Sequence, residues 1–396
     1  MLSSELAVLR AEHRELSTLD VCVVMTDFCE SNIGAWYSDP CLAPHFASGL
    51  LDVGLLDCDT PSSSLVVRSR GVTIDASSPT ANPILAFANY VFDSIKMDAF
   101  RVHGAALHEA RVSTFVLAQG SEDTNGSVDP SIPGNIQQEW SYHPISDPMA
   151  YYPGEERLGA LLEWYRQHLP EETTFTFPVS GLRLIQRLES WTSSGSVALF
   201  IADKAHTRVR QLASRRGSPI VSLHGSLSML VNLDAVGRYC AHSAEPGYVA
   251  LYTPHQNASI DVCFLHLGIP SVPRATQTFL DQVALFSTYD VFTMRDHAED
   301  VAASNGGATI NLVFTLLRLA RWDPDVLNQF ADTVQTFTSS AATWDLPTKR
   351  AAAALLGSIS NLKHSPRFDR DSEVESKCKE LQLLVEEALA FHEWPL

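Results

Sequence analysis

Short apolar runs, each followed by polar or acidic residues, recur along the first two thirds of the chain. Four of them have the length and character of buried parallel strands: Asp20–Thr26, Gly49–Asp59, Ile84–Ala88 and Ser196–Ala202. Between the first two, Glu30–Tyr37 has helical spacing. Strands that alternate with helices predict an α/β fold with one doubly wound sheet.

Further elements are predicted around this sheet. In chain order they are a helix at Ser3–Leu16, a small strand at Ser64–Arg68, a hairpin of Asp98–His103 and Ala106–Leu117, an exposed loop at 119–135, a helical cap at 150–192 with helices at Glu155–His168 and Gly181–Trp191, a core helix at Ser226–His242, an antiparallel pair of Gly247–Thr253 and Ser259–Leu267, and helices from residue 275 onward. We therefore expect an α/β domain over residues 1–270 and a helical region over 271–396.

Polar side chains follow the carboxyl ends of the four predicted strands, where open α/β sheets bind their ligands. They are Asp27 and Glu30, then Asp57 and Asp59, then Asn89 and Asp93, and finally Asp203. All are candidates for binding or chemistry. Alternatively, Asp27 caps a helix, and Asn89 and Asp93 satisfy the backbone of a turn.

The charge balance narrows the class of partner. The chain has 396 residues, of which 45% are hydrophobic and 19% charged, and its net charge is −18. This excess of acid repels nucleic acid and anionic membrane, so we expect neither as a partner. It suits a basic protein substrate, although a solvated acidic surface is the commoner explanation of such a charge balance. The basic residues between Lys204 and Arg216 are the exception and predict a solvated surface, or a contact with an acidic partner or a phosphate.

Cysteine and histidine spacing predicts no metal site. The seven cysteines contain no CxxC pair, and the 14 histidines show no HxxxH or HxH pair. This usage is typical of a reducing compartment. No stretch is long and apolar enough for a membrane span, and the acidic amino end resembles neither a signal nor a transit peptide. We expect a cytoplasmic protein, or a mitochondrial one if the native chain starts upstream of Met1.

The stretch after Asn82 carries a family resemblance. ANYVFDSIKMDAF resembles the signature of the MidA-like S-adenosylmethionine-dependent methyltransferases, a group that includes a mitochondrial complex I assembly factor. The shared residues are Ala88, Asn89, Phe92, Asp93 and Phe100. Two positions depart from the pattern, with Tyr90 in place of Glu and Lys96 in place of Pro.

Other segments resemble the same family in the same order along the chain, from about residue 20 to 330. They are VCVVMTDFCESNIGAW, SVALFIADK, SLHGSLSMLVNLDAVGRY and LLRLARWDPDVL. The motifs in these segments are similar to those of one branch of the family, in which this domain is fused to tetratricopeptide repeats.

The resemblance implies a class I methyltransferase sheet, the cofactor S-adenosylmethionine and methyl transfer to a protein arginine. It implies that Asp27, or Glu30 nearby, holds the ribose hydroxyls, and that the adenine lies near Leu56–Asp59. It places the substrate at Asn89 and Asp93, with Asp203 as a further candidate. His224 and Asn232 are better explained as core polar groups than as catalysts.

One departure affects the functional interpretation. The glycine-rich loop between the first strand and first helix, of Glu-x-Gly-x-Gly-x-Gly type, has no counterpart in this chain. We therefore expect a sheet without its first strand and with exposed apolar edges. Three interpretations follow: a methyltransferase in full-length form, a catalytically inactive scaffold or assembly factor of the same architecture, and another nucleotide-binding α/β enzyme. The oligomeric state stays open.

Overall fold

The computed structural model describes residues 10–13, 17–60, 64–116, 136–216, 221–223, 227–241, 248–252, 260–269, 272–285 and 310–319, and positions 294, 330, 333, 336 and 383. The chain divides into two compact units, Met1–Phe279 and Leu280–Leu396. The loop expected at 119–135, the helices expected beyond 320 and most of the helix expected at Ser3–Leu16 lie outside the described residues. The domain boundary expected at 270 stays a prediction.

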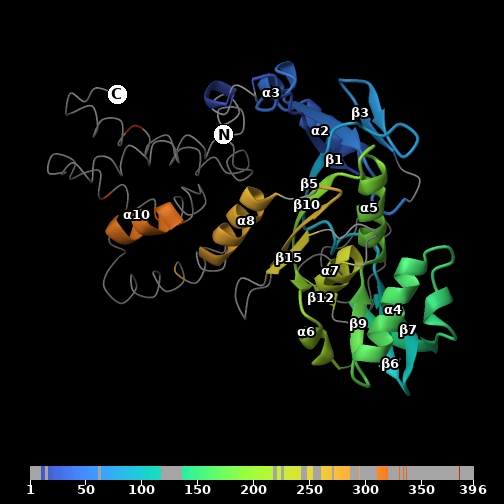
Figure 1. The fold of residues 1–396 in the computed structure, drawn as a ribbon. Helices are drawn as coiled ribbons and strands as arrows, with labels where there is room; N and C mark the ends of the chain where they lie inside the picture. Colours follow the sequence, from blue (N-terminus) through green and yellow to red (C-terminus); the bar gives the residue numbers. More distant parts are fainter. Residues whose placement is uncertain are drawn as a thin grey trace, which may run out of the picture. The chain divides into compact units, whose positions relative to one another are not determined.

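The amino-terminal strands form a small parallel sheet. β1 (Val23–Asp27) pairs with β2 (Leu51–Leu55), and α2 (Glu30–Tyr37) and α3 (Ala43–Ala47) connect them (Figure 1). The antiparallel hairpin of β3 (Leu65–Val67) and β4 (Val72–Ile74) follows. It is attached to β2 because the Arg68 N–H donates to the Val53 carbonyl at 3.0 Å.

A second, four-stranded sheet has the order β15-β16-β10-β5. β5 (Ile84–Asn89) runs parallel to β10 (Val197–Asp203), and β16 (Asp261–Leu267) runs antiparallel to both β10 and β15 (Tyr248–Tyr252). The predicted parallel strands and the predicted antiparallel pair are confirmed here. The fold is thus a mixed α/β fold.

An antiparallel sheet of order β8-β7-β6-β9 occupies the middle of the chain. Its strands and the elements after them are β6 (Asp98–His103), β7 (Ala106–Val116), β8 (Ile136–Pro144), η3 (Pro148–Ala150), α4 (Glu156–His168), β9 (Thr174–Phe177) and α5 (Val179–Ser190). The cap expected at 150–192 is therefore not wholly helical. The sequence Thr-Phe-Thr-Phe of β9 is β-branched and aromatic, and it pairs with β6 rather than continuing a helix.

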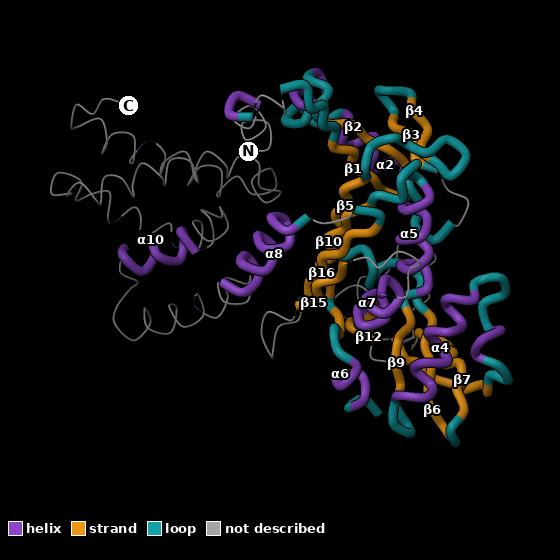
Figure 2. The backbone as a smooth tube through the Cα atoms, in the orientation of Figure 1, coloured by secondary structure: helices purple, strands orange, loops and turns teal. Residues whose placement is uncertain are grey.

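The remaining elements follow in chain order from the end of β10, apart from β15 and β16. They are β11 (Ala205–His206), α6 (Val209–Ala213), β12 (Val221–Leu223), β13 (Leu227–Met229), β14 (Val231–Asn232), α7 (Leu233–Ala241), α8 (Pro273–Leu285) and α10 (Ile310–Leu319) (Figure 2). The core helix expected from Ser226 begins only at Leu233, so this prediction was wrong at its amino end. The helix begins after Asn232, because the Asn232 side chain accepts the Ala235 N–H at 3.1 Å as a helix cap does.

The doubly wound sheet expected from the strand pattern is divided into two separate sheets among the described residues. β1 pairs only with β2, and β5 is the last strand of its own sheet among the described residues. On β5, Leu85 is 58% exposed and Phe87 is 73% exposed. With no neighbour on one side, these apolar side chains are uncovered, as expected for a sheet that lacks a strand.

The core continues from the four-stranded sheet to the helices and the antiparallel sheet. Among its fully buried side chains are Phe92, Phe100, Tyr165, Phe177 and Trp191. No helix among the described residues is long and apolar enough to cross a membrane.

Candidate functional site

Asp203, at the end of β10, holds the turn that follows β5. Its carboxylate is fully buried, and its Oδ2 accepts the backbone N–H groups of Phe92 at 2.9 Å and of Asp93 at 3.2 Å. Its Oδ1 accepts the Lys204 N–H at 3.0 Å. Burial, and then the charge of Asp93, raise the pKa of Asp203 to about 7, although the three N–H groups oppose this shift. The hydrogen bonds of Asp203 therefore stabilise the turn after β5 and the end of β10.

The turn itself presents one free side chain and one enclosed carboxylate. Asn89 is the last residue of β5 and is exposed, while Asp93 is only 8% exposed and accepts the Ser94 hydroxyl at 2.9 Å. Between them, Tyr90 has a φ of 53°, in the left-handed region that a non-glycine residue rarely adopts. This strained residue stands where the family pattern has glutamate, and it is 42% exposed.

The loop after β2 is fastened to this turn and to α5. Asp59 accepts the Lys96 N–H at 2.9 Å. The guanidinium of Arg187, which is only 8% exposed, donates to the carbonyls of Cys58 at 2.7 Å and of Thr60 at 2.5 Å. Asp57 accepts the Asp59 N–H and the Thr60 hydroxyl within the loop, and the Thr60 bond is the main cause that lowers the pKa of Asp57.

Asp27, at the end of β1, faces the start of α2. Its Oδ1 accepts the Cys29 N–H at 2.7 Å, and its Oδ2 accepts the Asn32 side-chain amide at 3.0 Å. The alternative prediction, that Asp27 caps a helix, is wrong, because the N-cap of α2 is Cys29 and α2 has no side-chain cap hydrogen bond. Each carboxylate oxygen can accept a second hydrogen bond, so Asp27 can still bind a ligand hydroxyl. Glu30 is 61% exposed and forms an ion pair with Arg68.

Hydrogen bonds connect the carboxyl ends of the four strands in series. The Leu56 N–H donates to the Asp27 carbonyl at 2.9 Å, which joins the ends of β1 and β2. The bond from Lys96 to Asp59 joins the β2 loop to the β5 turn, and the bonds to Asp203 join that turn to β10. The structure thereby connects Asp57, Asp59, Asp93 and Asp203, with Asn89 and Asp27 at the neighbouring strand ends.

Arg187, which holds the loop after β2, was not predicted from the sequence. It lies in α5 between Leu184 and Leu188, which are both buried. A cation on the apolar face of a helix is the signal that marked it, because a buried guanidinium requires acceptors. Of the two residues predicted to be core polar groups, Asn232 is buried but its Nδ2 has no hydrogen-bond partner among the described residues, and His224 lies outside them.

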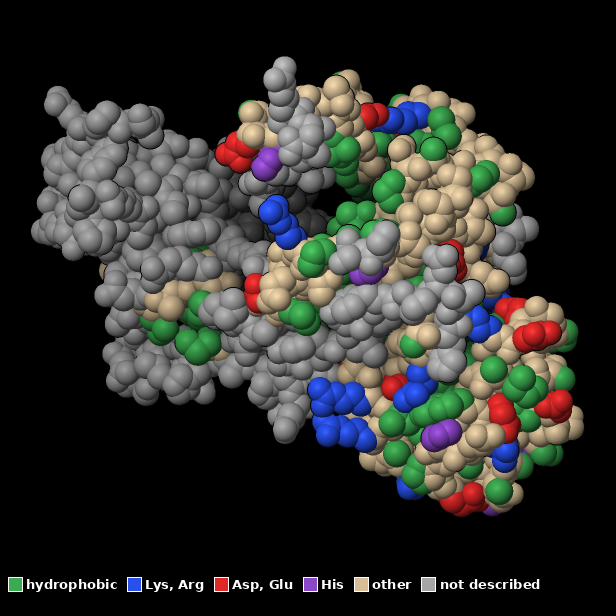
Figure 3. Space-filling model, viewed as in Figure 1, with side chains coloured by type: hydrophobic (Ala, Val, Ile, Leu, Met, Phe, Trp, Pro, Cys, Tyr) green, Lys and Arg blue, Asp and Glu red, His purple; other side chains and the backbone are tan. Residues whose placement is uncertain are grey.

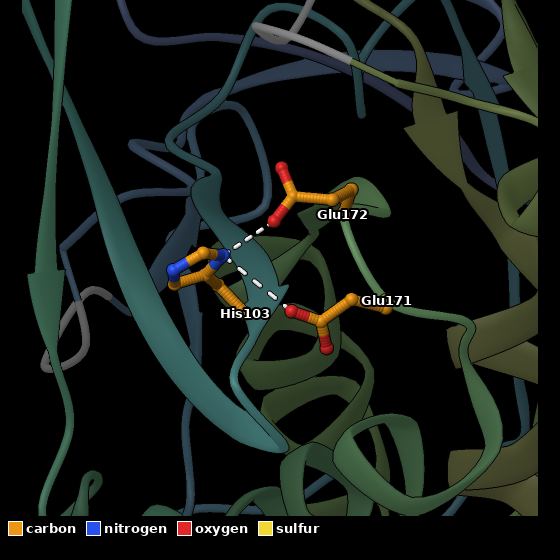
Figure 4. Close-up of side chains that lie close together, drawn as sticks. All are labelled: His103, Glu171 and Glu172. Carbon is orange, nitrogen blue, oxygen red and sulfur yellow. Dashed lines mark hydrogen bonds and ion pairs between the residues drawn. The ribbon is translucent and has the colours of Figure 1, made fainter.

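A separate cluster on the antiparallel sheet has the composition of a metal site. His103, Glu171 and Glu172 point toward one another, with 3.4 Å between His103 Nδ1 and Glu171 Oε1 (Figure 4). Glu172, however, also forms an ion pair with Arg101, and Glu171 accepts the Gly104 N–H. Because the carboxylates are already neutralised or hydrogen-bonded, the cluster connects β6 to the residues before β9 without needing a cation.

No protein-family model matches this chain, and no curated protein matches it. Among solved structures it is similar to a COG1565 superfamily member and "likely methyl transferase" from Burkholderia thailandensis, bound to S-adenosyl-homocysteine. The identity is 12%, the match covers 67% of this chain and 68% of the other, and the TM-score is 0.37. A likeness this distant carries no functional argument.

Proposed function

We propose that this chain has the architecture of a class I S-adenosylmethionine-dependent methyltransferase and uses the linked strand ends to bind cofactor and substrate. The observation that carries the proposal is the series of hydrogen bonds from Asp27 to Asp203 across four strand ends. Strand ends joined in this way form one edge, where open α/β sheets bind ligands. The cofactor, S-adenosylmethionine, is implied by the sequence segments that resemble the methyltransferase family in the same order along the chain.

The strand order supports the same architecture. β16 is an antiparallel strand between β10 and β15, while β5 and β10 are parallel. A class I methyltransferase sheet has an antiparallel strand at this position, as the resemblance implies.

The residues present fit the ribose end of S-adenosylmethionine. Asp27 keeps one acceptor position on each carboxylate oxygen, which suits two vicinal hydroxyls. The resemblance assigns the adenine to Leu56–Asp59, a loop that Arg187 holds in place. The methionine end has no glycine-rich cradle in this chain. The fit is therefore confined to the nucleoside part.

The cofactor would supply a sulfonium methyl group, which a substrate nitrogen would take over as the thioether S-adenosylhomocysteine leaves and the nitrogen gives up a proton. Asn89 ends β5 and Asp93 lies on the turn that follows, where an incoming arginine would be oriented. The Asn89 carbonyl oxygen and the Asp93 carboxylate accept guanidinium N–H groups, and the Asp93 charge offsets that of the arginine. Alignment of the nitrogen is the main contribution such residues make to the rate.

Calorimetric titration with S-adenosylhomocysteine tests this proposal. We expect binding in about the micromolar range, lost in Asp27→Asn, because an amide offers fewer acceptor positions than a carboxylate. Asp39→Asn is the matched control, since Asp39 accepts the Cys41 N–H at 2.7 Å in the same local geometry. If the folded wild-type chain does not bind S-adenosylhomocysteine, the methyltransferase function is excluded for this chain.

The second candidate is a catalytically inactive scaffold or assembly factor with the same architecture. It is favoured by the structural engagement of Asp203 and by the open apolar edge of β5. A folded chain that does not bind S-adenosylhomocysteine but does bind a protein partner is the outcome expected for this function. A basic protein suits the net charge of −18 in either case.

A further inference from the structure

A small pocket of about 10 Å³ lies between β9 and α6, and none of its lining residues belongs to the linked strand ends. Its walls are Thr174, Phe175, Thr176, His206, Leu212, Arg215 and Leu230. This volume holds about one water-sized atom. The pocket therefore accepts a single atom of a ligand rather than a whole molecule.

Two buried polar atoms that line the pocket have no hydrogen-bond partner among the described residues. They are the Thr174 hydroxyl and the Nε2 nitrogen of His206. Thr174 as a whole is only 3% exposed. A buried hydroxyl without a partner costs free energy, so such a group usually marks a bound water or ligand.

Arg215 adds an unneutralised charge to the same pocket. Its guanidinium has no hydrogen-bond or ion-pair partner in the part of the chain that the structure describes, and burial lowers its pKa. Burial, and then the charge of Arg215, lower the pKa of His206 to about 4, so the imidazole is neutral near pH 7. A water molecule would satisfy the hydroxyl but would leave the guanidinium charge without a counter-ion.

The surroundings of the pocket are basic. From Lys204 to Leu233 the chain has five lysine or arginine residues and no acid. Figure 3, in the same view as Figure 1, shows lysine and arginine side chains gathered at the place of α6. Two acids, Glu171 and Glu172, precede Thr174 closely in the sequence, but they are already bound by Gly104, Arg101 and His103.

The position of Arg215 is held by its neighbour. The Arg216 guanidinium donates to the Thr173 hydroxyl at 3.2 Å and to the Ala213 carbonyl at 2.6 Å, and the backbones of Thr173 and Arg216 form a bridge. The pocket is thus built by the fold and does not depend on a flexible side chain alone.

We infer that this pocket binds a phosphate group, with one oxygen inside it that accepts hydrogen bonds from the Thr174 hydroxyl and the Arg215 guanidinium. The remaining oxygens lie at the surface beside the basic residues. A dianionic tetrahedral group suits this arrangement, because it combines one inserted oxygen with a charge that offsets Arg215 and its neighbours.

Thermal unfolding and calorimetry with inorganic phosphate test the inference, with sodium chloride and acetate at equal ionic strength as reference anions. We expect a saturable rise of Tm with phosphate alone. Arg215→Gln weakens phosphate binding about tenfold or more, because it removes a charged hydrogen bond. Thr174→Val also weakens binding, while its stability without phosphate stays unchanged because the hydroxyl has no partner to lose.

Arg210→Gln is the matched control, since Arg210 is an exposed arginine of the same stretch and does not line the pocket. It leaves phosphate binding within about twofold, as expected for a screened surface charge. Equal effects of chloride or acetate, an equal loss in Arg210→Gln, no phosphate response in the wild type, or a response that survives both pocket variants would each overturn the inference.

Discussion

The Asp203 carboxylate accepts the Phe92 backbone N–H at 2.9 Å, although 111 residues separate them. This contact joins the end of β10 to the turn after β5. The Phe92 ring, fully buried, packs against α5 at Gly181. The turn that presents Asn89 and Asp93 is therefore held on one side by a carboxylate and on the other by a helix.

Gly181→Ala is expected to disturb this turn. An added Cβ would lie 2.4 Å from two atoms of the Phe92 ring, which is fully buried. We expect a loss of about 1–3 kcal/mol in the free energy of unfolding. Urea denaturation measures it, with Gly34→Ala in α2 as control.

Gly34 has no atom within 4 Å of an added Cβ, so this control should gain about 0.5–1 kcal/mol from helix propensity. Equal effects of the two substitutions would contradict the close contact between Gly181 and Phe92.

The raised pKa of Asp203 predicts a specific pH dependence. Between its usual pKa of 3.8 and its folded-state pKa of about 7, the folded protein binds the proton more tightly than the unfolded chain. Its contribution to stability is therefore present below pH 3.8 and is lost as the pH rises to about 7. Asp203→Asn removes this titration.

The measurement is the free energy of unfolding of the wild type and of Asp203→Asn across this pH range. The difference between the two proteins cancels the titration of the other groups. We expect the difference to change by about 1.4 kcal/mol for each unit of pKa shift. A difference that stays constant with pH would show that Asp203 is not perturbed.

Arg187→Met is expected to loosen the loop after β2. It removes the donor to the carbonyls of Cys58 and Thr60, and we expect a loss of about 2–3 kcal/mol. Arg183→Met on the same helix is the control, because Arg183 makes a partly exposed ion pair with Glu155 that contributes about 0–1 kcal/mol. Similar losses in urea denaturation would argue against the anchoring role of Arg187.

Leu85→Lys tests the open edge of β5. Leu85 is 58% exposed on a strand that has no partner on one side among the described residues, so a lysine there should discourage edge-to-edge pairing. We expect reduced concentration-dependent light scattering and a change in stability within about 0.5 kcal/mol. Val66→Lys on β3, where Val66 is 45% exposed, is the control. The edge is not open if Leu85→Lys unfolds the protein.

Much of the local structure was predictable from the sequence. The apolar run Ile84–Ala88 and the run before Asp203 were recognised as parallel strands, and the spacing in Glu155–His168 and Gly181–Trp191 identified α4 and α5. The acids at the strand ends were recognised because each follows its own strand directly. These properties depend on residues that are near one another in the chain.

Other properties depend on which segments meet in space. The apolar run of β5 has the pattern of a buried strand, yet Phe87 is 73% exposed because no strand covers that side among the described residues. The Thr-Phe-Thr-Phe segment became a strand because β6 offered it a partner. The bond of Asp203 to the β5 turn joins residues distant in sequence, and so does the placement of Arg215, which has no partner among the described residues, beside Thr174. Periodicity along the chain determines an element's type and direction, whereas its neighbours determine its burial and the partners of its charges.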